Sequence, residues 1–152
     1  MTTQLAIAIA LHQLATLVWV GGMFFAHFAL RGALKDLAPP QRLGLMRHVL
    51  QRFFVWVWVA IVVLWGSGLW IFSGVYNHNM GMHVTAMIVL GAIMTVLFVY
   101  LYFVPYPRFK TAVAAEDWTG ASAALVVLRR IILANLMLGL VTAGLGSAGR
   151  YF

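Results

Sequence analysis

Lys, Arg, Asp and Glu are absent from three long stretches of this chain, residues 1–30, 53–107 and 131–149. Each stretch is rich in aliphatic and aromatic residues, and one helix needs ~20 such residues to cross the core of a bilayer. The first and third stretches are long enough for one span each, and the second is long enough for two. The pattern therefore predicts an all-α integral membrane protein and excludes a soluble globule.

We place four spans at about residues 4–30, 53–74, 80–104 and 131–149. The second and third are separated only by the polar run Tyr76-Asn77-His78-Asn79, which predicts a tight turn and a membrane hairpin. Short amphipathic segments precede the second and fourth spans, and Asp117 is the expected N-cap of the last helix. The prediction is a single domain, residues 1–152, folded as an antiparallel four-helix bundle with helical extensions on the cytoplasmic side.

Basic residues outnumber acidic ones by 10 to 3, and all of them except Arg150 flank the first and third connections and not the middle turn. Because Lys and Arg favour the cytoplasmic side, both termini are expected on the outer side of a bacterial inner membrane. The bilayer is then the main partner. Nucleic acid is excluded, because the basic residues stand at span ends and do not alternate with exposed aromatic residues.

His12 is an ionisable side chain inside the apolar first span. At helical spacing it shares a face with Thr16, Trp19, Met23 and Ala26, which indicates that it points into the bundle and not into lipid. Buried histidines of this kind mark a cofactor, an ion path or a proton relay. The alternative is a packed histidine bonded to a backbone carbonyl or a threonine of the next helix.

Small residues predict where the helices approach one another. Gly21 and Gly22 would admit a neighbouring backbone next to the first span. On the fourth span, a small and polar stripe predicts a packing face with an interhelical hydrogen bond from its first member; the stripe is Asn135, Gly139, Thr142 and Gly146.

Two histidines, His12 and His83, are expected at matched depth on antiparallel helices. This is what axial ligation of a haem b in a four-helix bundle requires, so we interpret them as the haem ligands. His27 and His48 form a second pair that would suit a second haem nearer the other side. The alternative for His48 is a solvated histidine at the headgroups.

A competing set of ligands surrounds the middle turn, where two imidazoles and two thioethers fall within six positions: His78, Met80, Met82 and His83. Soft ligands of this kind favour copper, particularly Cu(I). The chain has no cysteine, so thiolate sites and disulfides are excluded. The alternative is a polar turn that contains methionines by chance.

Several segments carry a family resemblance: LHQLATLVWVGGMFF, QRFFVWVW with SGLWIF, MHVTAMIVLG, and FVPYPRFKTAVAAEDW followed by LRRIILANLMLGL. They resemble the CopD-like membrane proteins, the copper-resistance D family, and more distantly the haem-binding HemJ proteins, whose first-span histidine corresponds to His12. The resemblance implies a four-helix bundle and haem. HemJ proteins carry a lysine where this chain has Thr85. This difference argues against HemJ-type protoporphyrinogen oxidation.

The leading interpretation is a haem b-binding inner-membrane protein that transfers electrons, with quinol or a redox partner protein as donor. Copper binding or copper import of the CopD type is the alternative, and HemJ-like protoporphyrinogen oxidation is a further one. The residues identify no catalytic group, so a membrane oxidoreductase and a protein without catalysis both stay open. The fourth-span stripe also allows a homo-oligomer or a subunit of a larger complex.

Overall fold

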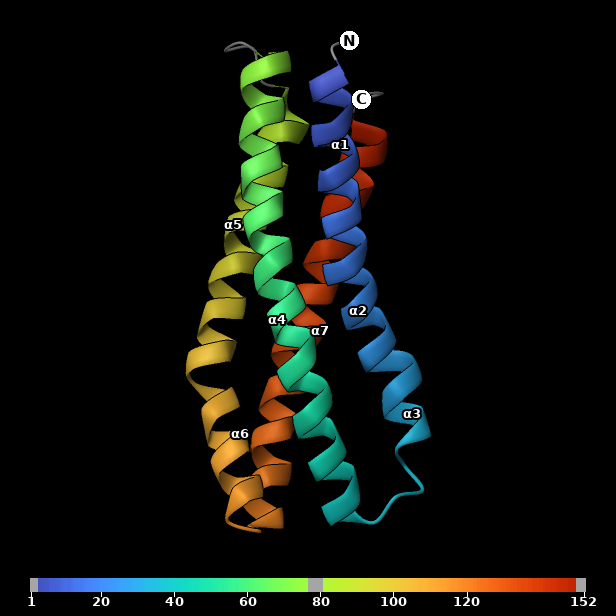
Figure 1. Ribbon diagram of the computed structural model, residues 1–152, viewed down its shortest axis with the longest axis vertical. Helices are drawn as coiled ribbons and strands as arrows, with labels where there is room; N and C mark the ends of the chain where they lie inside the picture. Colours follow the sequence, from blue (N-terminus) through green and yellow to red (C-terminus); the bar gives the residue numbers. More distant parts are fainter. Residues whose placement is uncertain (1–2, 77–80, 150–152) are drawn as a thin grey trace.

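The computed structural model describes residues 3–76 and 81–149, and every regular element within those ranges is a helix. Figure 1 shows long helical rods along one common axis, with the start of α1 (Thr3–Thr16) and the end of α7 (Trp118–Ala148) at the same end. We call this the terminal end. The opposite end, where α4 (Pro39–Ile71) begins, is called the basic end because Arg31, Arg47 and Arg108 lie toward it.

The first rod continues α1 through two π-helical segments and two single helical turns. They are η1 (Leu17–Gly21), α2 (Gly22–Phe24), η2 (Phe25–Leu30) and α3 (Arg31–Ala33). The remaining elements are η3 (Phe72–Tyr76), which extends α4, then α5 (Met82–Phe103) and α6 (Pro105–Ala114). The predicted turn of the membrane hairpin falls largely on residues 77–79, which lie outside the described residues.

Local sequence explains where these helices begin. Ala38 is extended, with ψ 147°, and Pro39 then opens α4 at a position where its missing N–H has no helical partner. Pro105 begins α6 and separates it from α5, because proline lacks the N–H that a continuous helix would need at this position. Before α7, the side chain of Asp117 accepts a hydrogen bond from the backbone N–H of Gly120 at 2.8 Å, so the predicted N-cap is confirmed.

Within the described residues, four helices are long and apolar enough to cross a membrane: Thr3–Ala33, Pro39–Gly74, Met82–Ala114 and Trp118–Ala148. Only 17% to 33% of the most apolar stretch of each helix is buried by the rest of the chain. Most of this apolar surface therefore faces outward, where lipid covers it. The predicted all-α membrane bundle is confirmed, and so are the helical extensions at the basic end.

The helices pack in pairs, α1 along α4 and α5 along α7, while α6 packs on α7 at the basic end. A group of five rings, which we call the aromatic cluster, joins α4, α5 and α6 in the basic half; it consists of Phe54, Trp58, Phe98, Tyr102 and Tyr106. The ring centroids of Phe54 and Tyr106 are 4.8 Å apart, and those of Trp58 and Phe98 are 5.2 Å apart. Both pairs meet edge to face, the arrangement that aromatic quadrupoles favour.

The predicted packing face of α7 is confirmed. Asn135 is buried, and its Nδ2 donates a hydrogen bond to the backbone carbonyl of Met94 on α5 at 3.2 Å. A Cβ on Gly139 would lie 2.8 Å from Val20 Cγ2 and 3.1 Å from Met94 Cε, so only glycine fits between these side chains as they stand. Gly146 likewise faces Met87.

The prediction for the first rod was less accurate. Gly22 does admit a neighbour, but that neighbour is the ring of Phe53 on α4 and not a backbone. A Cβ on Gly21 would meet nothing within 4 Å in the described part of the chain. The reason is the direction of the two positions, because consecutive residues of a helix point about 100° apart and only one of them can face α4.

Candidate functional site

His12 lies on α1 and faces α4. Its ring is half-buried, and its Nδ1 is 3.0 Å from the hydroxyl oxygen of Ser67, a buried residue of α4. A Cβ on the next residue, Gly68, would lie 3.4 Å from His12 Cε1, so the imidazole lies directly against this turn of α4. The expectation that His12 points into the bundle is confirmed.

The hydroxyl of Ser67 indicates which nitrogen of His12 carries the proton. Ser67 Oγ donates its one proton to the carbonyl of Val63, with Leu64 O as a longer second acceptor at 3.3 Å. The short contact with Val63 favours Ser67 as the donor there and as the acceptor toward His12, so we assign the hydrogen to Nδ1. The lone pair of neutral His12 is then on Nε2, as in metal-binding histidines whose other nitrogen donates to an orienting acceptor.

His83 lies in the first turn of α5 and is half-buried against the end of α7. A Cβ on Gly149 would lie 2.7 Å from His83 Cβ, and one on Gly146 would lie 3.1 Å from Met87 Cε. His83 and Met87 thus use the small residues of α7 as their packing surface. The two histidines predicted as haem ligands contact different helix pairs: His12 contacts α4, and His83 contacts the region where α7 ends.

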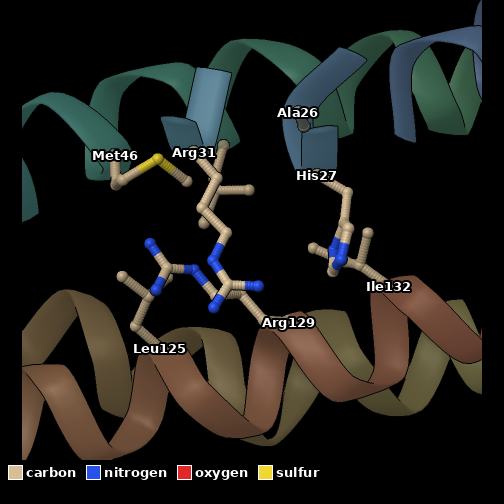
Figure 2. Close-up of a pocket in the computed structure, with 8 residues that line it drawn as sticks. Ala26, His27, Arg31, Met46, Leu125, Arg129 and Ile132 are labelled. Carbon is tan, nitrogen blue, oxygen red and sulfur yellow. The ribbon is translucent and has the colours of Figure 1, made fainter. Parts of the chain in front are cut away.

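The second predicted pair has two distinct environments. His48 is exposed, and its Nδ1 is 2.9 Å from the carbonyl of Gly44 on its own helix. His27 lies on η2 and lines a small cavity together with Arg31 and Arg129. Figure 2 shows its side chain pointing toward α7, beside Ile132. A second haem held by His27 and His48 stays a prediction.

Part of the predicted copper set can be located. Met82 begins α5 with 89% of its surface exposed, and His83 follows it. His78 and Met80 lie outside the described residues. Within the described ranges, no three side chains among His, Cys, Asp and Glu come together as a metal-binding group.

Sequence reasoning did not identify Ser67 as the partner of His12. The two residues are 55 positions apart, and nothing local connects them. The available signal was a serine in an apolar helix, since such a hydroxyl usually bonds to its own backbone and can accept a second bond. Sequence reasoning also gave Arg31 and Arg129 only a topological role, whereas the structure brings them to one cavity.

Four apolar helices make this chain a multi-pass membrane protein. Residues 47–148 match the sequence profile of the family described as copper resistance protein D, and the chain belongs to that family. The matched range includes Ser67, His83 and Met87 but begins after His12. No curated protein and no solved structure matches the chain.

Proposed function

We propose that this protein handles copper in the membrane and binds the ion at the terminal end of the bundle, with Nε2 of His12 as one ligand. The family of copper resistance protein D is the main support for the metal. The observation that carries the site is the hydrogen bond between His12 Nδ1 and Ser67 Oγ, because with Nδ1 assigned as the donor the Nε2 lone pair is left for a metal. Copper is here the cargo of the protein.

Other side chains at the terminal end of the bundle fit a soft cation. Imidazole nitrogen suits copper in either oxidation state, and methionine sulfur selects Cu(I). Met82 and His83 open α5 at the same end of the bundle, and Met87 lies one turn further along. Together with His78 and Met80 from the connecting segment, these residues are the proposed copper ligands beside His12.

The experiment is a Cu(I) titration of the purified protein in detergent against a coloured chelator of known affinity. His12→Ala should weaken binding by more than tenfold. Ser67→Ala should weaken it by about tenfold, since partners that orient a ligand contribute about 10 to 100-fold to metal affinity. The matched control is Ser73→Ala, because Ser73 Oγ also donates to a carbonyl in the preceding turn but has no hydrogen bond to a histidine among the described residues. Unchanged affinity in His12→Ala would contradict the proposal.

Haem b is the second candidate, because an orienting bond at Nδ1 also suits an axial ligand of haem iron. His12 and His83 would then hold the iron, and the haem would supply one-electron transfer from quinol or a partner protein. The visible spectrum of the purified protein decides between the candidates. A Soret band that disappears in His12→Ala and in His83→Ala but stays in His48→Ala would replace copper with haem. A colourless protein that binds Cu(I) through His12 would exclude haem.

The proposed location is a bacterial inner membrane, with the basic end in the cytoplasm and both termini outside. The support is the distribution of Lys and Arg, which gather at the basic end. A reporter fused after Phe152 that is active only outside the cytoplasm is the expected result, and activity only inside would reverse the orientation.

A further inference from the structure

A cavity between the first rod, α4 and α7 combines apolar walls with two arginines and a histidine. Its walls come from Met46, Leu50, Leu125 and Ile132, and its polar members are His27, Arg31 and Arg129. Figure 2 shows Arg31 reaching from the first rod toward α7, so that its guanidinium lies beside that of Arg129. Arg129 is half-buried and Arg31 is exposed, so a group from outside can reach the pair.

Two positive charges in one partly buried place repel each other unless an anion lies between them. The cavity lining contains no acidic side chain. The whole chain has only three acids, and they lie in the turns after α3 and before α7: Asp36, Glu116 and Asp117. Of these, Asp117 is engaged as the N-cap of α7. The chain thus brings two guanidinium groups together and supplies no carboxylate in the cavity.

The cavity has a volume of about 20 Å³ and is too small for a phosphate group. We propose that Arg31 and Arg129 hold a phosphate group between them at the opening of this cavity, where Arg31 is exposed, with His27 at its edge. Guanidinium groups bind phosphate through pairs of parallel hydrogen bonds, and they lose less hydration in doing so than an ammonium group does. The source of the phosphate is either the headgroup of an anionic phospholipid or free inorganic phosphate. We favour the lipid headgroup, because Arg31 is exposed at the basic end, where the arginines of span ends meet the headgroups. Basic pockets between membrane helices are known to take such headgroups.

This site is independent of the proposed copper site, because it lies in the basic half and shares no residue with it. The test compares the protein in nanodiscs of pure phosphatidylcholine with nanodiscs that contain phosphatidylglycerol. Phosphatidylglycerol should raise the thermal unfolding midpoint, since a ligand that binds only the folded state stabilises it. Retention of phosphatidylglycerol is measured in parallel by mass spectrometry of the intact complex.

The variant Arg31→Gln/Arg129→Gln should lose the rise in midpoint and bind phosphatidylglycerol at least tenfold more weakly. The matched control is Arg52→Gln/Arg130→Gln, which removes the same charge from two exposed residues that do not line the cavity. In pure phosphatidylcholine the cavity variant should be at least as stable as the wild type, because the repulsion is gone. Should the double variant fail to fold, Arg129→Gln alone provides the same comparison.

A third condition distinguishes the two sources. Inorganic phosphate is added to the protein in phosphatidylcholine at constant ionic strength, with chloride as the reference. Stabilisation by phosphatidylglycerol alone assigns the site to a lipid headgroup, and stabilisation by inorganic phosphate assigns it to the free anion. Equal responses of the cavity variant and its control to both additions would overturn the proposal.

Discussion

The two halves of the bundle are packed with side chains of different size. In the basic half, large side chains such as Phe54, Phe109 and Leu128 are almost fully buried, and the aromatic cluster joins α4, α5 and α6. In the terminal half, the buried side chains on α1 and α4 include the small residues Ala8 and Ser67. Tight packing in lipid depends on contact area, because lipid is as apolar as the core. The comparison indicates that the basic half holds the fold together, whereas the terminal half has polar groups available for a ligand.

The largest expected effect tests this difference directly. Phe54→Ala removes a ring that is 2% exposed and that contacts Phe98, Tyr102 and Tyr106 edge to face. We expect a loss of about 3 kcal/mol, at the lower end of such losses in soluble proteins because no water is excluded from a lipid-covered bundle. Unfolding in detergent by a denaturant measures it. The control is Val55→Ala on the exposed side of the same turn.

Ser67→Ala is the corresponding change in the terminal half, and its stability loss is compared with that of Phe54→Ala. Its hydroxyl contributes hydrogen bonds but little contact area, so we expect a loss of about 1 kcal/mol or less. Equal losses for Phe54→Ala and Ser67→Ala would mean that stability is spread evenly along the bundle and that the comparison is wrong.

The second expected effect concerns Gly139 of α7, which packs against both η1 and α5. A Cβ on Gly139 would lie 2.8 Å from Val20 and 3.1 Å from Met94, whereas one on Gly144 would meet nothing within 4 Å in the described part of the chain. We therefore expect Gly139→Ala to destabilise the protein by about 1 to 3 kcal/mol, as overpacking does. Gly144→Ala should instead be neutral or add up to about 1 kcal/mol, because alanine is the better helix former. If both changes have the same sign, the helices do not depend on this close contact.

The sequence was sufficient for features that depend on neighbouring residues or on periodicity. Pro39 and Asp117 mark helix starts through local backbone chemistry, and Asn135 was predicted as an interhelical hydrogen bonder because an apolar helix rarely carries an amide without a partner. Such signals need only a few positions of the chain.

Features that depend on the relative rotation of two helices could not be predicted. The bond between His12 and Ser67 requires that α1 and α4 turn particular faces toward each other. The same holds for the cavity that brings Arg31 to Arg129 across 98 positions of sequence. Charge at a span end indicates the side of the membrane, but it does not say which of several arginines will meet.

The smallest expected effect lies where the two halves join. Asn135 Nδ2 donates to Met94 O at 3.2 Å, but its Oδ1 is buried without a hydrogen-bond partner in the described part of the chain. Met94 lies inside α5, so its carbonyl still has the backbone N–H of Phe98 as a helical partner when the asparagine is removed. Asn135→Leu therefore loses one hydrogen bond, of about 1 kcal/mol, and also removes an unpaired oxygen that costs about 1 to 3 kcal/mol.

These two contributions have opposite signs. Polar interactions in membranes lie at the lower end of such ranges, so the two nearly cancel, and we expect Asn135→Leu to change the free energy of unfolding by less than about 1 kcal/mol in either direction. Asn135→Ala is the control, because it removes the same polar groups and leaves a cavity, which should make it the less stable of the two variants. Denaturant unfolding of the three proteins in one detergent measures both differences. A loss above about 2 kcal/mol in Asn135→Leu would contradict the balance and show that the amide does more than join α5 to α7, since single interhelical bonds in membranes contribute at most about 1.7 kcal/mol.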